Sequence, residues 1–548
     1  MHNIPTIPGR RGDLILTSSA IFFSLSIAED GVAMSLPLKM RSALLTAALL
    51  LCGYTLCELA QANDSFEVWP TKEWRTSTPE EQGMDSTTLA NLIDFGATHE
   101  LESLLVIRHG TIIAEAYYAP FRAGVKHRIN SATKSIVGTL IAIALRKGLL
   151  DSLDHRVMDF FSDRTIANLD DNKKAITIEN LLDMTSGLDW TEPLGGGRPE
   201  SMMAMERSAD WEQFVLDRPM ATEPGGKFNY NSGNPQLLSA ILTGLTGQSA
   251  LDYARKRLFG PLGISDVFWR SDPHGISIGG YGLFLQPRDM AKFGYLYLHD
   301  GVWEGDQIIP PSWIDRIRHA TIPMNLMNLR YANLFWVASD SNAYFANGYH
   351  GQRIFVMPAL DIVAVATGTG HSASISKEIE MIADAVKSDA PLPPDADSQS
   401  LLARRIREAA VEKPSPVGPA PEIAKAISGK IYRFPENAQR LSTLALNLDG
   451  VNPSYAYELT TGRPDAPVER FEGPIGLDGT YRAGKPTNQG ITVAKGAWSD
   501  DKSFVVQFGE LGGDNMRTAI LSFKGEGVDL VLVSEFGFST ILHGETAD

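Results

Sequence analysis

Cysteine and positive charge are both scarce in this sequence. The chain has 548 residues but only 2 cysteines, and its 49 lysine and arginine residues are outnumbered by 65 aspartate and glutamate residues, for a net charge of −16. So few cysteines exclude a disulfide framework, and a chain this acidic, without a basic cluster, is not expected to bind nucleic acid. The 11 histidines include no His-Glu-x-x-His motif and no metal-like spacing, so we expect no metal and no cofactor.

Both cysteines, Cys52 and Cys57, lie in an N-terminal apolar segment with the pattern of a secretory signal. Lys39 and Arg41 precede the apolar run, and an Ala-Gln-Ala sequence ending at Ala62 supplies a small-x-small cleavage site. We therefore predict an exported protein, periplasmic or secreted, that is cleaved after Ala62. The run is short for a membrane span, and a single membrane anchor is the alternative. The mature protein would then hold no cysteine and no stable membrane span.

The rest of the chain divides into three regions after an N-terminal extension and signal peptide at 1–62. Between 63 and 390 strand and helix patterns alternate, with "SLLVIRHGTIIAEAYY" predicting a hairpin and "RIFVMPALDIVAVATG" predicting two strands near the other end. Strands at both ends with helices between them predict an α/β (α+β) domain, in which a mostly antiparallel sheet is flanked by helices and joined to an all-helical subdomain.

The C-terminal part of the chain differs in composition and in its secondary-structure pattern. Residues 391–421 are rich in proline and alanine, which predicts a linker around one short charged helix. From 422 to 548, strand-like segments alternate with turns such as "SDDK" and "GEG". This pattern predicts an all-β barrel or sandwich domain.

A serine and a lysine begin the apolar segment "INSATKSIVGTLIAIALRKG". Ser131 and Lys134 are three residues apart, so on a helix the amine can reach the hydroxyl. The segment is apolar on every face, which predicts a buried helix, with Asn130 or Ser131 capping its start. Burial lowers the pKa of a lysine, so Lys134 could accept a proton from Ser131. The alternative is a lysine whose amine reaches solvent along its apolar stem.

The same Ser-x-x-Lys spacing occurs twice more. Lys377, three residues after Ser374, is crowded by two glutamates and should face water. Lys502, three residues after Ser499, lies in the hairpin turn "WSDDKSF" and should be solvated. Neither environment favours an uncharged amine.

Tyr230 stands in the glycine- and asparagine-rich stretch "GGKFNYNSGNP", just before a predicted helix. A tyrosine hydroxyl held near a lysine can act as a phenolate or as a proton relay. The alternative is a loop aromatic packed on the helix start.

Two other motifs indicate rival folds. "GISIG" at 275–279 fits the Gly-x-Ser-x-Gly nucleophile elbow, but it lacks the strand before it and the helix after it that the elbow needs. "GTGHSA" at 368–373 follows a strand as a dinucleotide-binding loop would, but no second parallel strand comes after it.

Taken together, the "SATK" helix, a tyrosine motif about a hundred residues downstream and a glycine-rich strand before the last two strands resemble the serine β-lactamase and penicillin-binding-protein superfamily. The likeness covers roughly 73–386 and, through "ENLLDMTSGLDW" and "GGYGLFLQPRDMAKFGYLYL", is closest to the class C-like hydrolases and esterases. "YNS" and "GYHGQ" are similar to the 6-aminohexanoate-dimer (nylon-oligomer) hydrolases.

The resemblance implies a catalytic role for three residues. Ser131 matches the nucleophile, Lys134 its base partner, and Tyr230 the tyrosine of the family's Tyr-x-Asn motif. Ser232 stands at the third position of that motif, where the family has asparagine.

The family's Lys-Thr-Gly strand motif is replaced by "ANGYHGQ". The resemblance aligns Gly348 with the motif's glycine, so that the Tyr349 N–H would join the Ser131 N–H in an oxyanion hole. His350 would then lie beside the substrate. Trp190, after the "TSGL" turn, is a candidate pocket wall or a core residue.

The predicted function is an exported serine hydrolase that cleaves a small amide, ester or peptide substrate through an acyl-enzyme on Ser131. Loss of the strand lysine removes the usual anchor for the carboxylate of penicillins and D-alanyl peptides. A D-alanyl-D-alanine carboxypeptidase or β-lactamase is the alternative within the family. A non-catalytic cell-wall-binding protein on the same fold is the alternative of another class.

Overall fold

The computed structural model describes residues 69–194, 197–324, 328–370, 374–460, 468–513, 516–533 and 539–546. These residues all belong to one compact unit that begins at Val68. The predicted signal segment, with Cys52, Cys57 and the cleavage site at Ala62, lies outside the described residues. Within the described part of the chain, no helix has the length and apolar character needed to cross a membrane.

A nine-stranded sheet forms the centre of the first domain, in the order β1-β3-β2-β14-β13-β12-β11-β10-β9. The predicted hairpin is confirmed, because β2 and β3 pair antiparallel and turn at His109 and Gly110, whose φ angles of 48° and 69° suit a tight hairpin turn. β14 returns from the far end of the domain and pairs antiparallel with β2. The strands are β1 (Arg75–Thr76), β2 (Leu101–Arg108), β3 (Thr111–Tyr117), β9 (Ile322–Pro323), β10 (Arg330–Ala332), β11 (Phe335–Ala338), β12 (Ala343–Gly348), β13 (Gln352–Met357) and β14 (Ile362–Gly368).

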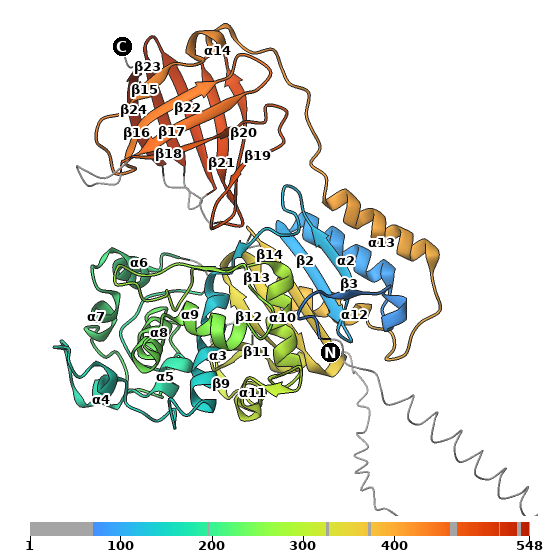
Figure 1. Cartoon of the computed structure of the whole chain (residues 1–548), viewed down its shortest axis with the longest axis vertical. Helices are drawn as coiled ribbons and strands as arrows, with labels where there is room; N and C mark the ends of the chain where they lie inside the picture. Colours follow the sequence, from blue (N-terminus) through green and yellow to red (C-terminus); the bar gives the residue numbers. More distant parts are fainter. Residues whose placement is uncertain are drawn as a thin grey trace, which may run out of the picture. The chain divides into compact units, whose positions relative to one another are not determined.

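Helices cover both faces of this sheet, which explains why every residue of β2, β13 and β14 is buried. α10 (Pro287–Leu298) packs on β13 and β14, with Gly294 close to Val363. α2 (Ser86–Thr98), α12 (Ile375–Ala385) and α13 (Ala396–Ala409) form the other group, and α2 contacts both of its companions (Figure 1). α13 lies in the predicted linker, yet its Leu402 is buried in the core of the first domain.

The middle of the chain supplies the predicted helical part. α3 and α8 pack against each other, and shorter helices surround them (Figure 1). The helices are α3 (Thr133–Arg146), α4 (Asp171–Ala175), α5 (Ile178–Leu182), α6 (Glu200–Arg207), α7 (Trp211–Leu216), α8 (Gly233–Thr246), α9 (Ala250–Ala254) and α11 (Pro311–Arg318). Two small sheets complete this part, formed by β4 (His127–Arg128), β5 (Phe268–Trp269) and β6 (Leu283–Leu285), and by β7 (Val302–Trp303) and β8 (Asp306–Gln307).

The C-terminal domain is a ten-stranded antiparallel sheet curled into a near-barrel, which confirms the predicted all-β architecture. It has a hydrophobic core of its own, separate from that of the first domain. The short helix α14 (Glu422–Ile427) precedes the strands β15 (Ile431–Arg433), β16 (Leu441–Asn447), β17 (Ser454–Leu459), β18 (Glu469–Pro474), β19 (Arg482–Pro486), β20 (Ile491–Asp500), β21 (Ser503–Leu511), β22 (Arg517–Lys524), β23 (Gly527–Val533) and β24 (Ser539–Thr546).

A buried ion pair fastens α12 to the sheet. Glu378 on α12 accepts a hydrogen bond from the Arg353 guanidinium on β13, and both side chains are less than a tenth exposed. The same helix carries an exposed pair, in which Lys377 donates to Glu380 at 2.9 Å. Removing one partner of a buried pair leaves an uncompensated charge in the interior, whereas an exposed charge is solvated.

Glu378→Ala should therefore lower the free energy of unfolding by about 3–5 kcal/mol, and Glu380→Ala by less than about 1 kcal/mol. Urea unfolding followed by tryptophan fluorescence measures both changes on the same helix. Equal losses in the two variants would contradict the assignment of Arg353–Glu378 as the pair that holds α12.

Candidate active site

The chain turns sharply just before α3. The Ile129 N–H donates to the Leu283 carbonyl at 2.9 Å, and Asn130 then takes a left-handed conformation with φ of 47°. A 3-10 helix over Asn130–Ala132 leads directly into α3. The predicted side-chain cap is wrong, since neither Asn130 nor Ser131 caps the helix start. The Asn130 amide instead donates to the Tyr349 carbonyl at 3.0 Å.

Lys134 is buried, as the sequence predicts. Its side chain is 1% exposed, because α3 is enclosed from Thr133 to Ala144. Ser131, in contrast, is only partly buried. The two competing lysines differ as expected, since Lys377 is 47% exposed and Lys502 lies in the exposed turn between β20 and β21. The Ser131–Lys134 pair therefore combines a reachable hydroxyl with an amine removed from water.

Three oxygen atoms surround the Lys134 amine. Its Nζ lies 2.9 Å from Ser131 Oγ, 2.9 Å from Ser232 Oγ and 2.8 Å from the Gly280 carbonyl oxygen. A neutral amine has two N–H donors and one lone pair. The Gly280 carbonyl can only accept, and Ser232 Oγ donates its own hydrogen to Glu192 at 2.6 Å. The amine lone pair is therefore left for the Ser131 hydroxyl.

Burial lowers the pKa of the Lys134 amine to about 8, although the negative charge of Glu192 acts in the opposite direction. A pKa of about 8 leaves about a tenth of Lys134 uncharged at pH 7, whereas an ordinary lysine, with a pKa of about 10.4, is less than about a thousandth uncharged. The amine also lies 4.8 Å from the centre of the Tyr230 ring, a contact that favours its charged form.

Glu192 is the residue that the sequence analysis missed. Its carboxylate accepts hydrogen bonds from the Ser232 backbone N–H at 2.8 Å and from the Trp190 indole at 2.7 Å, besides that from Ser232 Oγ. Trp190 is buried in the core and touches Glu192, so its observed contact is with a carboxylate of the site. The sequence shows that Glu192 is an acidic residue two positions after Trp190. The residues around it in the sequence do not indicate that it contacts Ser232.

Tyr230 lies beside the Ser131–Lys134 pair. It is 6% exposed and directly precedes the loop that starts α8. Burial and the nearby charge of Glu192 raise the pKa of its phenol, while a hydrogen bond with Ser131 lowers it. Because the net shift is upward, the neutral phenol is favoured over the phenolate, which suits Tyr230 to donating or relaying a proton.

The two residues after Tyr230, Asn231 and Ser232, make different contacts. Ser232, at the position where the family has asparagine, contacts Lys134. Asn231 is fully buried, and its side-chain oxygen accepts from the Gly233 N–H at 2.7 Å at the start of α8.

The glycine-rich strand end is packed against the Ser131 turn. A Cβ on Gly348, the last residue of β12, would lie 2.3 Å from the Ile129 carbonyl oxygen, so only glycine fits there. Tyr349 follows and is tied by its carbonyl to Asn130, next to Ser131. Its ring is 47% exposed and lies 4.0 Å, centre to centre, from that of His350, which takes a left-handed conformation with φ of 65°. The contact with Asn130 places the Tyr349 backbone beside the Ser131 turn.

The "GISIG" segment forms no nucleophile elbow, because no strand leads into it and no helix follows it. It does serve the lysine site. A Cβ on Gly279 would lie 1.9 Å from the Pro235 carbonyl oxygen, and one on Gly280 3.1 Å from Ser232. This close approach is what brings the Gly280 carbonyl to Lys134.

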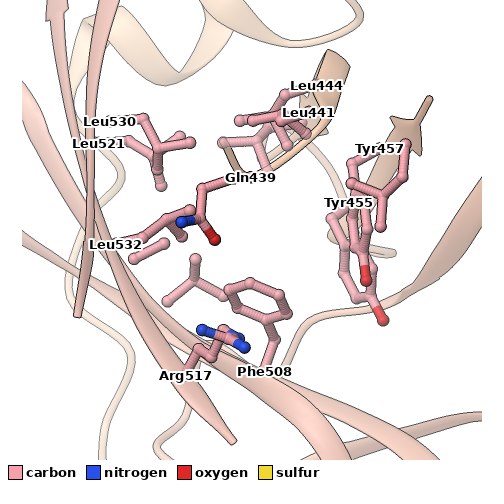
Figure 2. A pocket seen from close by; sticks show the side chains of 14 residues that line it. Gln439, Leu441, Leu444, Tyr455, Tyr457, Phe508, Arg517, Leu521, Leu530 and Leu532 are labelled. Atoms are coloured by element: carbon pink, nitrogen blue, oxygen red, sulfur yellow. The ribbon is translucent and has the colours of Figure 1, made fainter. Parts of the chain in front are cut away.

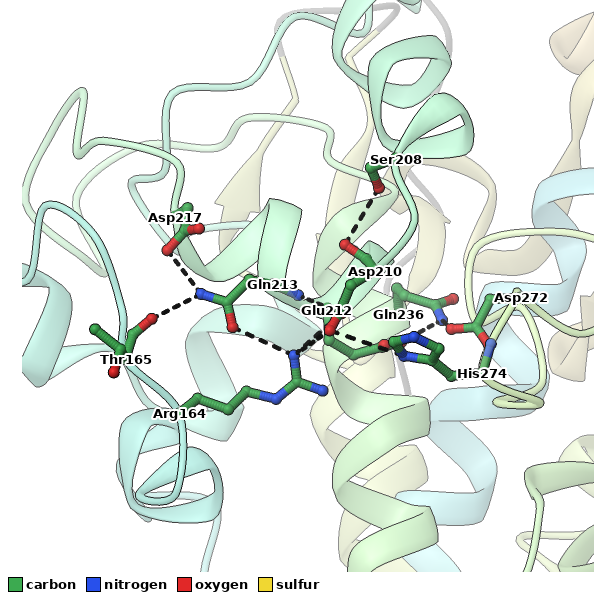
Figure 3. Close-up of polar contacts among 10 residues, drawn as sticks. All are labelled: Arg164, Thr165, Ser208, Asp210, Glu212, Gln213, Asp217, Gln236, Asp272 and His274. Carbon is green, nitrogen blue, oxygen red and sulfur yellow. Dashed lines mark hydrogen bonds and ion pairs between the residues drawn. The ribbon is translucent and has the colours of Figure 1, made fainter.

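An acid and histidine cluster lies at the start of α7. Ligand atoms of Asp210, Glu212 and His274 lie within 4.8 Å of one another (Figure 3). Asp210 already accepts from Arg164 at 2.9 Å and from the backbone of Gln213 at 2.8 Å, so a cation already neutralises it.

Glu212 in this cluster is 1% exposed, and burial together with a hydrogen bond to Asp272 raises its pKa to about 7. A protonated Glu212 can donate to Asp272, and Gln236 bridges the two carboxyl groups at 2.7 and 3.1 Å. The cluster therefore forms a polar network that joins α7, α8 and the 272–274 loop.

The known proteins that resemble this chain in sequence include the following three. The 6-aminohexanoate-dimer hydrolase of Paenarthrobacter ureafaciens is 24% identical over 285 residues, which are 48% of the chain and 71% of that protein. Penicillin-binding protein 4 of Amycolatopsis lactamdurans is 33% identical over 253 residues, or 40% of the chain and 61% of that protein. Esterase EstB of Burkholderia gladioli is 25% identical over 191 residues, or 32% of the chain and 48% of that protein.

The beta-lactamase family model matches residues 98–383, just over half of the chain. The matched stretch begins in α2, ends in α12 and contains Ser131, Lys134 and Tyr230. The chain therefore belongs to the beta-lactamase family, whose members are serine hydrolases.

Proposed function

We propose that this protein is an exported serine hydrolase that cleaves small amides or carboxylic esters through an acyl-enzyme on Ser131. The observation that supports this most strongly is the buried Lys134 amine, which lies 2.9 Å from Ser131 Oγ and has a pKa lowered to about 8. Export rests on the signal-like segment that ends at Ala62. A purely structural role for Lys134 would not require a partly exposed serine beside it, whereas a nucleophile must be reachable by the substrate.

Acylation begins when the neutral Lys134 amine accepts the Ser131 hydroxyl proton and Oγ attacks the substrate carbonyl carbon. The carbonyl oxygen becomes an oxyanion that the backbone N–H groups of Ser131 and Tyr349 stabilise. Such a donor contributes about 3–4 kcal/mol in comparable sites. The Asn130–Tyr349 contact supports this pairing, because it holds the Tyr349 backbone beside the Ser131 turn.

The leaving group receives its proton from Tyr230, whose raised pKa keeps the phenol protonated. The Lys134 ammonium returns the proton to Tyr230, so the leaving amine or alcohol departs neutral and the lysine is free again. A water molecule then attacks the acyl carbon, Lys134 and Tyr230 take its proton and pass it to Ser131 Oγ, and the acyl–oxygen bond breaks to release the acid and restore the Ser131 hydroxyl.

The preferred substrates are short linear amides and carboxylic esters. In "ANGYHGQ" the family's strand lysine is missing, and with it the usual partner for the carboxylate of penicillins and D-alanyl peptides. Tyr349 and His350 offer two aromatic rings in the segment that replaces the lysine motif. The 6-aminohexanoate-dimer hydrolase and the esterase among the relatives are consistent with this preference.

A D-alanyl-D-alanine carboxypeptidase or β-lactamase is the second candidate. It is favoured by the 33% identity to a penicillin-binding protein, the highest identity of the three relatives.

A substrate panel separates these candidates. We expect p-nitrophenyl esters of short acids or a 6-aminohexanoate dimer to be hydrolysed, and nitrocefin and a D-Ala-D-Ala peptide to be hydrolysed about ten- to a hundredfold more slowly in kcat/KM. The reason is the lost carboxylate anchor, since a buried charge-assisted hydrogen bond contributes about 1.5–3 kcal/mol. Ser131→Ala should abolish turnover, and Ser374→Ala, at the exposed Ser-x-x-Lys pair, should leave it unchanged.

Two outcomes of that panel contradict the proposal. Strong nitrocefin turnover without ester or amide cleavage would reverse the ranking of the candidates. Failure of every substrate, together with failure of a phosphonylating serine probe to label Ser131 by mass spectrometry, would indicate a non-catalytic protein on the same fold.

Glu192→Gln tests the electrostatics of the site. The lysine acts in its neutral form, so kcat/KM should rise with pH through a pKa of about 8. The charge of Glu192 favours the ammonium, and removing it should lower that pKa and shift the rising limb to lower pH. Two charges about 4 Å apart interact by about 4 kcal/mol at an effective dielectric constant of about 20, and the interaction weakens with distance and solvent exposure. Because Glu192 is partly exposed, we expect a shift of about one pH unit.

The matched control is Asp189→Asn, three residues earlier, whose carboxylate pairs with Arg218. It should leave the pH profile in place. A fall in kcat for Glu192→Gln without any shift of the profile would mean that Glu192 only holds Ser232 in position.

A further inference from the structure

The C-terminal near-barrel encloses a cavity of about 190 Å³. The residues that line it come from β16, β17, β21, β22, β23 and the loop before β16. On four of these strands the lining residues alternate along the chain, as expected for side chains on the inner face of a curved sheet. They are Tyr455, Tyr457 and Leu459 on β17, Val506 and Phe508 on β21, Arg517, Ala519 and Leu521 on β22, and Leu530 and Leu532 on β23.

The wall of this cavity is almost entirely apolar. Leucine, tyrosine and phenylalanine side chains make up most of it. Small antiparallel barrels either fill their interior with side chains or hold a ligand there. A dry apolar cavity of about 150 Å³ holds one benzene molecule. The cavity of the near-barrel can therefore hold an apolar group of about six to eight carbon atoms.

Two polar side chains stand at one end of the cavity. Arg517 is the first residue of β22, and Gln439 lies two residues before β16 begins. These strand ends are at the same end of the sheet, together with Phe508 and Leu532. Figure 2 shows the Gln439 amide pointing into the space between the leucine side chains and the two tyrosines, with the Arg517 guanidinium beside Phe508.

Among the residues that the structure describes, the Arg517 guanidinium has no ion-pair partner. The side-chain amide of Gln439 likewise has no hydrogen-bond partner among them. A guanidinium presents a fork of donors that matches a carboxylate, and a glutamine amide offers one more donor. An apolar chamber that ends in these two groups matches one class of molecule, a short apolar chain with an anionic head.

We propose that the C-terminal domain binds a medium-chain carboxylate, with its alkyl chain among Leu444, Leu521 and Leu530 and its carboxylate on Arg517 and Gln439. The site is formed entirely by residues of the β domain, so it is separate from Ser131 and does not depend on the proposed hydrolysis. It assigns this domain a ligand-binding role of its own.

Isothermal titration calorimetry on the full chain with octanoate as the probe tests this. Octanoate should bind with one site per chain. Butyrate, which has four fewer methylenes to bury, should bind at least about a hundredfold more weakly. Octanol, with the same chain but no charge, should bind about two- to fivefold more weakly, because it cannot pair with the exposed Arg517 guanidinium.

Two substitutions locate the site. Arg517→Gln should weaken octanoate binding about two- to fivefold, since the guanidinium is exposed to solvent, and should leave octanol binding unchanged, because only the carboxylate uses the guanidinium. Ala519→Leu fills the chamber and should abolish binding of both. Arg433→Gln, an exposed arginine on β15 that does not line the cavity, is the matched control and should bind octanoate like the unaltered chain.

Absence of octanoate binding would overturn the proposal. Binding that Arg517→Gln and Ala519→Leu leave intact would also overturn it, because the ligand would then lie elsewhere, including at Ser131. If Ala519→Leu does not fold by circular dichroism, Arg517→Gln alone decides, since that side chain is exposed at the cavity mouth and packs in no core.

Discussion

The contact between the Lys134 amine and the Ser131 hydroxyl is the interaction on which the account of the first domain depends. It requires an amine without water around it, and the fold supplies this by enclosing α3 between the sheet and α8. The Gly280 carbonyl and Ser232 occupy the other two positions around the amine. Because neither can donate a proton to it, the geometry directs the lysine lone pair at one oxygen. Burial lowers the pKa of the amine and so determines the fraction of Lys134 that is uncharged.

Local patterns in the sequence were sufficient for much of this architecture. The β2–β3 hairpin follows from a His-Gly pair between two apolar alternations, and the burial of Lys134 from an apolar run with no polar face. The same reasoning separated Ser131–Lys134 from two other Ser-x-x-Lys pairs, because neighbouring glutamates and a hairpin turn mark a solvated lysine. The all-β character of the C-terminal domain follows from strand-like segments separated by turns, although the number of strands does not. Each of these features is decided by residues close together in the chain.

Contacts between distant residues account for what the sequence did not predict. Glu192 reaches Ser232 across 40 positions, and the Gly280 carbonyl reaches Lys134 across 146. The expected cap at Asn130 failed for the same reason, because its amide is drawn to Tyr349, 219 residues away. The size of the cavity in the near-barrel depends on how strongly the sheet is curved. The alternation of residues along a strand predicts which side chains face inward, but it does not predict the volume left between them.

The most direct measurement is the pKa of Lys134 itself, followed by NMR through the side-chain carbon resonances of protein labelled with ¹³C at lysine Cε. The resonance that disappears in Lys134→Met identifies the residue. The account predicts that this lysine titrates near pH 8, whereas the exposed lysines titrate near the usual value of about 10.4. A Lys134 resonance that titrates together with the exposed lysines would mean that less than about a thousandth of the amine is uncharged at pH 7, and the proposed acyl transfer from Ser131 would lose its base.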